Sequence, residues 1–247
     1  MCLFWEKKYT DTIHVKNNFF INIKSEIDNK SITMKWITTA TFICMYFSAC
    51  SQSSSKNNTQ PAQHIGGRCE GCEAIFETPI PFDQLNHIDT LPDFERYEQK
   101  LLLTGTVYQV DGKTPAKDVV LYVYHTDPSG IYPREENDKG WAQRHGYIRG
   151  WIKTNEKGEY RFYTFRPASY PNSTQPQHVH ITVKEPDKNE YYIDEFLFAD
   201  DPHLPKENNN RKPRGSNGVV QPEMKNGIST ARRDIVLGKN IPDYPVN

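Results

Sequence analysis

The chain has 247 residues, of which 36% are hydrophobic, 25% are charged and 12% are aromatic. This length and composition predict one or two globular domains and exclude both a disordered chain and a polytopic membrane protein. Its 30 Lys and Arg side chains almost balance 31 Asp and Glu side chains, so we expect no basic surface for a phosphate backbone and no nucleic-acid partner.

The first 60 residues differ in composition from the rest of the chain. All 17 prolines and all 14 glycines lie at or beyond Pro61. Residues 1–33 are rich in Phe, Ile, Lys and Asn and show no periodic apolar pattern. We interpret them as an upstream segment that does not belong to the folded protein, which makes Met34 the expected start.

Residues 34–49 have the pattern of a secretory signal peptide. A lysine near the start is followed by the apolar run 36–47 and by small residues before Cys50. This run is too short to span about 30 Å of hydrocarbon, which disfavours a transmembrane anchor. The segment resembles a bacterial lipobox, which implies that Cys50 is acylated and that this lipid alone attaches an exported protein to the membrane. The expected location is the periplasmic or outer-membrane side of a bacterial envelope.

Residues 50–95 are expected to hold a tether and a cysteine loop. Residues 51–63 are mostly Ser, Asn and Gln, a composition typical of flexible linkers. Cys69 and Cys72 follow. In an exported protein this Cys-x-x-Cys spacing favours a small disulfide over a zinc half-site, because no second such pair completes a zinc cage.

Residues 96–247 predict an all-β domain, an antiparallel β-sandwich with long loops. Apolar and polar residues alternate in short segments, which turn clusters such as Asp111-Gly112 separate. No long amphipathic helix is expected after Cys50. The expected strands are residues 101–109, 119–125, 147–153, 160–165, 178–184, 191–198 and 234–237.

Two histidines and two tyrosines are the candidate functional residues. His178 and His180 lie two residues apart in an expected strand, so both imidazoles project from one face and could bind a metal ion or form a polar surface. Tyr132 and Tyr170 lie in proline-containing loops. Together the four would offer two nitrogen and two oxygen donors, and phenolate oxygen suits a trivalent ion. Composition alone favours the simpler interpretation that the tyrosines cap loops.

Four motifs containing these residues follow one another along the chain. They are Gly130-x-Tyr132, Thr154-x4-Glu159-Tyr160-x-Phe162, Pro167-x-x-Tyr170-Pro171 and Pro176-x-His178-x-His180. Their order resembles that of the intradiol ring-cleavage dioxygenases, such as protocatechuate 3,4-dioxygenase and catechol 1,2-dioxygenase. The likeness extends over roughly residues 101–244.

This resemblance implies a β-sandwich that binds a non-haem Fe(III) ion. Tyr132 and His180 would be equatorial ligands, Tyr170 a labile axial tyrosinate and His178 the axial histidine. Tyr170 would also act in catalysis, by accepting a proton from the substrate. The implied reaction inserts both atoms of O2 into a catechol-type ring, which is cleaved between its two hydroxylated carbons to a muconate-type diacid.

Two positions depart from the family pattern. Gln175 stands where the family usually has an arginine that stabilises the electron-rich bound ring, so as a catalytic residue it would give weaker electrostatic support. Glu195 stands where the family usually has a glutamine, and its carboxylate could repel an anionic substrate or be a solvated strand residue. A neutral catechol is therefore a more strongly expected substrate than protocatechuate.

A non-catalytic binding module is the alternative interpretation. Segments 103–107 and 154–162 also resemble transthyretin-like and carboxypeptidase-regulatory-like sandwiches of exported bacterial proteins, which need no histidine pair facing two tyrosines. A zinc hydrolase fits less well, because no carboxylate or cysteine ligand stands in an evident motif with the histidines. The tyrosine and histidine motifs favour the enzyme. The sequence sets neither the catechol, nor the oligomeric state, nor the face of the envelope.

Overall fold

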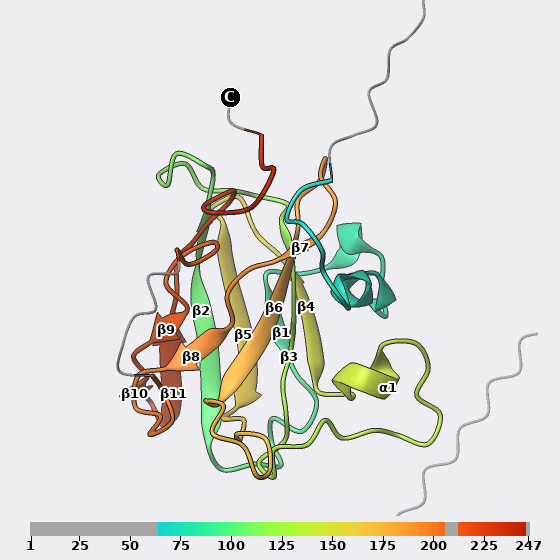
Figure 1. Ribbon diagram of the computed structural model, residues 1–247, viewed down its shortest axis with the longest axis vertical. Helices are drawn as coiled ribbons and strands as arrows, with labels where there is room; N and C mark the ends of the chain where they lie inside the picture. The colour runs from blue at the N-terminus through green and yellow to red at the C-terminus, as the bar shows by residue number, and fades with distance from the viewer. Residues whose placement is uncertain (1–63, 206–211, 246–247) are drawn as a thin grey trace, which may run out of the picture. The chain divides into compact units, whose positions relative to one another are not determined.

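The computed structural model describes residues 64–205 and 212–245, and these residues form two β-sheets with few helices (Figure 1). The predicted signal peptide at 34–49, the upstream segment 1–33, the predicted lipidation site Cys50 and the predicted tether at 51–63 lie outside the described residues. Among the helices that are described, none has the length and apolar character needed to cross a membrane.

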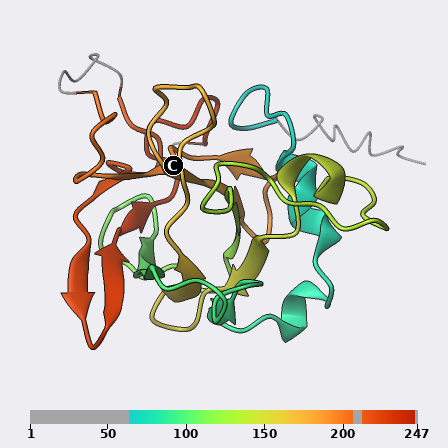
Figure 2. The ribbon, with the colours of Figure 1, turned by 90° about the horizontal axis from the view of Figure 1, so that it is seen from below.

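The first sheet is built around β2. Its residues alternate between buried and half-buried positions, because Leu101, Leu103 and Val107 point into the core while their neighbours face outward. β2 pairs antiparallel with β5 and parallel with β11 and β12, and β10 with β11 forms a hairpin at the edge (Figure 2). The strands are β1 (Ile88–Thr90), β2 (Lys100–Tyr108), β5 (Glu159–Phe165), β10 (Glu223–Lys225), β11 (Ile228–Arg232) and β12 (Ile235–Val236).

The second sheet is built around β3 and β6, which pair antiparallel. β4 joins β3 on one side, and β7 and β8 pair with β6. β9 lies at the edge of this sheet and pairs parallel with β8. The strands are β3 (Val120–Tyr124), β4 (Arg149–Lys153), β6 (His178–Lys184), β7 (Tyr191–Tyr192), β8 (Phe196–Phe198) and β9 (Val219–Val220).

The main core lies between the apolar faces of the two sheets. It includes Leu103 and Phe162 from the first sheet with Val179, Ile181 and Val183 from the second, all at most 2% exposed. The predicted all-β sandwich is confirmed. The structure adds parallel pairings, two of them to the central strand β2, and divides the predicted strand 191–198 into β7 and β8.

A smaller core covers the outer face of β3 and β4. The 3-10 helix η1 (Cys72–Glu77) packs Ala74 and Ile75 against Tyr122 and Trp151, so β3 is buried on both faces (Figure 1, teal helix beside β4). The other helices in the described residues are also short, η2 (Phe82–Gln84) and α1 (Ala142–His145), as expected for a chain without a long amphipathic pattern.

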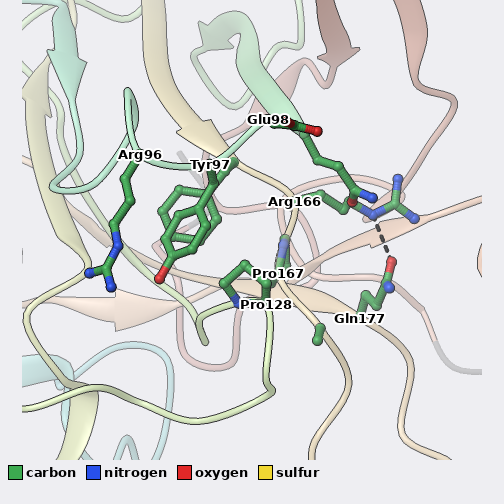
Figure 3. Close-up of a pocket in the computed structure, with 10 residues that line it drawn as sticks. Arg96, Tyr97, Glu98, Pro128, Arg166, Pro167 and Gln177 are labelled. Atoms are coloured by element: carbon green, nitrogen blue, oxygen red, sulfur yellow. Dashed lines mark hydrogen bonds between the residues drawn. The ribbon is translucent and has the colours of Figure 1, made fainter.

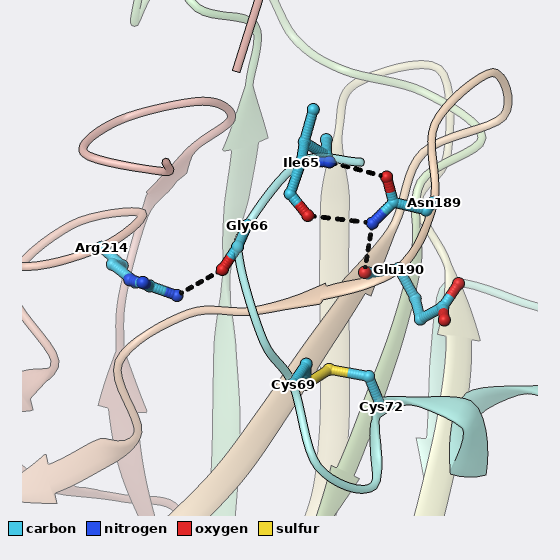
Figure 4. The surroundings of a disulfide bond; sticks show 7 residues. All are labelled: Ile65, Gly66, Cys69, Cys72, Asn189, Glu190 and Arg214. Carbon is cyan, nitrogen blue, oxygen red and sulfur yellow. Dashed lines mark hydrogen bonds between the residues drawn. A yellow bond between two sulfur atoms is a disulfide. The ribbon is translucent and has the colours of Figure 1, made fainter. Parts of the chain in front are cut away.

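The strap, residues 64–71 before η1, is hydrogen-bonded to the loop between β6 and β7 and to residues near the C-terminus. The amide of Asn189 exchanges two hydrogen bonds with the backbone of Ile65, and Arg214 donates to Gly66 O at 3.1 Å (Figure 4). The Cys69–Cys72 disulfide closes the turn that follows. The start of η1 is thereby held close to the outer face of β6.

Candidate metal centre

The strand β6 supplies the two histidines. Val179, Ile181 and Val183 face the core, so the alternation of a β-strand places His178 and His180 together on the opposite face. The structure gives β6 the bounds 178–184 that the sequence predicted.

Two loops that are far apart in the sequence supply the tyrosines, and a hydrogen bond and a close backbone approach join these loops. Thr126 Oγ1 donates to Ala168 O at 2.7 Å. Gly130 has a φ of +82°, and a Cβ atom at this position would lie 2.0 Å from Ser169 O. Only glycine permits this left-handed turn at so close an approach, which brings the two tyrosine loops together.

The four predicted ligands converge. Tyr132 Oη lies 2.5 Å from Tyr170 Oη and 2.9 Å from His180 Nε2. His178 Nε2 lies 3.1 Å from both Tyr170 Oη and His180 Nε2, and Tyr170 Oη lies 3.4 Å from His180 Nε2. Atoms that each lie about 2 Å from one shared ion are separated by roughly 3 Å, so this spacing fits four donors to a single metal ion.

The protonation states at the cluster also fit a metal site. Burial raises the pKa of both Tyr132 and Tyr170, so without a nearby cation both are neutral phenols. Burial lowers the pKa of His178, and its Nδ1 lies 2.7 Å from Pro176 O. A neutral His178 that donates from Nδ1 to this carbonyl leaves the lone pair of Nε2 directed at the tyrosines.

The tyrosines are required for this donor set. Across residues 64–205 and 212–245, no three His, Cys, Asp or Glu side chains are grouped so that they could hold a metal ion. Two imidazole nitrogens and two phenol oxygens are therefore the candidate ligands. Phenolate oxygen is a hard anionic donor, which suits Fe(III) better than a soft divalent ion.

Aromatic side chains that the sequence analysis missed support His180. Tyr124 lies opposite His180 in the β3–β6 register, and their rings stack with centroids 4.5 Å apart. The other face of Tyr124 stacks on His145 at 3.7 Å, and His145 Nδ1 contacts Tyr122 Oη at 2.9 Å. The sequence does place Tyr122 and Tyr124 on one face of the expected strand 119–125. It does not show that this strand pairs with β6, which is what brings Tyr124 to His180.

The two departures from the family pattern take different positions. Gln175 is exposed in the loop before β6, and among the described residues its side chain makes no hydrogen bond to the four donors. Glu195 Oε1 lies 3.7 Å from His180 Nδ1, and the neighbouring His180 ring holds the pKa of this carboxyl at about 2. Glu195 is therefore an ionised neighbour of the cluster.

Two cavities lie near the ligand loops. One, of about 210 Å³, adjoins His180 and is lined by Glu70, Gly71, Tyr124 and Glu195 among others. The other, of about 480 Å³, lies against residues 165–168 and Gln177 (Figure 3).

Arg166 borders the larger cavity. The structure pairs it with Asp200 at 2.8 Å and Gln177 at 2.7 Å, and stacks it on Phe198. The positive charge of Arg166 is therefore already paired with the carboxylate of Asp200.

Comparison with known proteins relates most of the described chain to one family. A family profile described as Dioxygenase matches residues 78–226. The chlorocatechol 1,2-dioxygenase of Cupriavidus pinatubonensis is 29% identical over 135 residues, which are 47% of this chain and 51% of that protein. The protocatechuate 3,4-dioxygenase beta chain of Burkholderia cepacia is 24% identical over 112 residues, 43% of this chain and 47% of that one.

An intradiol ring-cleavage dioxygenase of Aspergillus niger is 25% identical over 116 residues, 40% of this chain and 35% of that protein. The chain thus spans about a third to a half of the curated relatives it matches. A dioxygenase domain from Streptomyces sp. SirexAA-E aligns with 60% of this chain and 85% of its own at 19% identity, with a TM-score of 0.47.

Proposed function

Because the chain belongs to the intradiol ring-cleavage dioxygenase family, we propose that it is a non-haem Fe(III) enzyme that acts on a catechol-type substrate. Both atoms of O2 enter the ring, which opens between the two hydroxylated carbons to a muconate-type diacid. The observation that carries this proposal is the convergence of Tyr132, Tyr170, His178 and His180, each of which has its donor atom 2.5–3.4 Å from those of at least two others.

These four side chains would hold the ion. A bound ferric ion supplies the positive charge that ionises phenols and withdraws electron density from a coordinated catecholate. The protein's own contribution is to prepare the donors. β6 fixes both histidines on one face, and the Pro176 carbonyl keeps the proton of His178 on Nδ1 so that Nε2 is available.

Tyr170 has a second role in the proposal, as the base that accepts a proton from the substrate. Its Oη contacts Tyr132 Oη and both Nε2 atoms, so a catechol hydroxyl that reaches the cluster comes within proton-transfer distance of it. Once protonated, Tyr170 is a neutral phenol again, the state that its buried surroundings favour.

The charges near the cluster support a neutral catechol as substrate. Glu195 is an ionised carboxylate beside His180, and it lines the adjoining cavity. Gln175 supplies no positive charge where the family usually has arginine. A ring that carries a carboxylate would therefore meet negative charge without a compensating cation.

We also propose that the protein is an exported lipoprotein anchored through Cys50, which would place the reaction outside the cytoplasm. The signal-like segment 34–49 and the tether composition of residues 51–63 support this. Labelling with a radioactive fatty acid tests it: wild type should incorporate the label, and Cys50→Ala should not. Equal labelling of the two would contradict acylation at Cys50.

The enzymatic proposal is tested on the purified full-length protein. We expect near-stoichiometric ferric iron, a visible tyrosinate charge-transfer band that shifts when a catechol is added without oxygen, and then O2 uptake with release of a ring-opened diacid. Tyr163→Phe, which alters a tyrosine of β5 outside the cluster, serves as the matched control and should behave as wild type. A colourless protein that cannot be loaded with Fe(III) would instead support the non-catalytic binding module.

A further inference from the structure

The two candidate histidine ligands differ in the group that faces Nδ1. His178 Nδ1 lies 2.7 Å from the neutral carbonyl of Pro176. His180 Nδ1 instead faces a carboxylate, with Glu195 Oε1 at 3.7 Å. A carbonyl and a carboxylate both favour a proton on Nδ1, but only the carboxylate adds a full negative charge behind the ring.

The backbone that carries Glu195 is firmly held. Buried Arg233 donates to Asp194 O through Nη1 and to Ser216 Oγ through Nε at 3.0 Å. On the other side Gly218 packs so closely that a Cβ atom there would lie 2.2 Å from Glu195 O. Only the side chain of Glu195, which is 40% exposed, is left to adjust, and it lies beside the His180 ring.

The other sides of His180 are occupied by groups without charge. Tyr124 covers one face of the ring, and Tyr132 Oη and Tyr170 Oη approach Nε2. The second acid of the adjoining cavity, Glu70, is paired with Arg144 at 2.8 Å. Glu195 is thus the carboxylate that acts directly on this imidazole.

We propose that Glu195 is a positioning residue for His180. Its carboxylate fixes the proton of His180 on Nδ1, directs the Nε2 lone pair at the two tyrosines, and adds a negative charge that favours a ferric over a ferrous ion. The last effect rests on the proposed function, whereas the control of the imidazole tautomer does not. Carboxylates behind metal-binding histidines act in this way because they make the ring a stronger donor.

The test compares variants with matched charge changes. Glu195→Gln removes the charge and keeps the size of the side chain, and Glu195→Ala removes the contact. Glu70→Gln is the control, since it removes a charge from the same cavity at a residue that Arg144 already pairs. Ferric and ferrous affinity and the reduction potential are measured on the loaded protein. The His180 tautomer is measured by 15N NMR on the metal-free protein.

We expect Glu195→Gln to weaken Fe(III) binding by about 10–100-fold and Glu70→Gln to leave it unchanged. If ferrous affinity stays the same, the potential rises by about 59 mV for each tenfold loss. The metal-free wild type should hold His180 as the Nδ1–H tautomer, and Glu195→Ala should show a mixture. Wild-type affinity and potential in Glu195→Gln, or an unchanged tautomer in Glu195→Ala, would overturn the proposal.

Failure of the proposed function gives a different result. In that case wild type itself binds no ferric ion, and the NMR measurement on the metal-free protein decides alone. A tautomer that depends on Glu195 then supports the positioning role, and one that does not depend on it rejects that role.

Discussion

The phenol oxygens of Tyr132 and Tyr170 lie 2.5 Å apart, although the two tyrosines are 38 positions apart in the sequence. Burial raises the pKa of both, so without a cation they share a hydrogen bond as neutral phenols. Two phenolates at this distance would repel each other strongly. The pair is therefore stable in its ionised form only next to a concentrated positive charge such as a ferric ion.

The two tyrosines should respond differently to removal of the hydroxyl. We expect Tyr170→Phe to retain iron and lose at least about 100-fold in kcat, because three donors remain while the base for the substrate proton is lost. Tyr132→Phe should lose iron as well as turnover, since the proposal makes Tyr132 a permanent ligand of the ion and Tyr170 a labile one. Iron content, the charge-transfer band and O2 uptake measure these effects. Unchanged turnover in Tyr170→Phe would refute its role as a base.

A negative charge on the substrate should lower the catalytic efficiency. We expect wild type to prefer catechol over protocatechuate in kcat/KM, because Glu195 is ionised near the cluster and Gln175 is neutral. Gln175→Arg should raise kcat/KM for protocatechuate by about tenfold, which corresponds to ~1.4 kcal/mol. Gln99→Arg adds the same charge at the other cavity and should have no such effect. Equal gains in both variants would indicate a general charge effect instead.

The histidine strand could be predicted from the sequence because its signal is local. Residues 178–184 alternate between apolar and polar side chains, and that pattern alone sets both the strand and the common face of the two histidines. The convergence of the tyrosines is not local. It depends on the approach of Gly130 to Ser169 across two loops, so only the family resemblance indicated it.

The features that the sequence analysis missed depend on long-range pairing. β10 and β11 lack a clear alternating pattern, and β11 is fixed by its parallel pairing with β2. The predicted strand 191–198 is interrupted near Asp194, whose carbonyl accepts a hydrogen bond from the buried Arg233, 39 residues later in the chain. The antiparallel register of β6 and β8, which pairs Val179 with Phe196, brings Glu195 beside His180, and no local pattern shows it.

The disulfide should stabilise the strap and η1 beside the metal cluster. A Cβ atom on Gly71, between the two cysteines, would lie 2.8 Å from His145 Nε2, and His145 stacks on the Tyr124 ring that supports His180. Replacing both Cys69 and Cys72 with Ser should lower the free energy of unfolding by about 2 kcal/mol, the loop-closure value for so short a loop. Denaturant unfolding measures this loss.

The control for the disulfide is the wild type treated with a thiol reductant, which should show the same loss of stability while the double Ser variant shows no further change. If the double variant is as stable as wild type, the packing of Ile75 and Trp151 in the smaller core holds η1 without the covalent link.

Acid should destabilise the fold through His125, which lies fully buried behind the site. Its Nδ1 contacts Thr126 O at 2.7 Å and its Nε2 contacts Thr164 Oγ1 at 2.6 Å, and burial lowers its pKa to about 4 from 6.5. Between these two pH values the His125 imidazole is protonated in the unfolded chain and neutral in the folded protein. Stability is therefore fully present above pH 6.5, falls as the pH decreases toward 4, and loses nothing more from this group below that.

The expected loss from His125 is roughly 3 kcal/mol between pH 6.5 and 4, since each pKa unit corresponds to about 1.4 kcal/mol. The measurement compares the free energy of unfolding of wild type and His125→Gln across this range. The difference between them should shrink on acidification by roughly that amount, because only wild type carries the buried imidazole. His203→Gln, at an exposed histidine, should follow wild type at every pH. A constant difference between wild type and His125→Gln would mean that the folded protein accommodates the imidazolium.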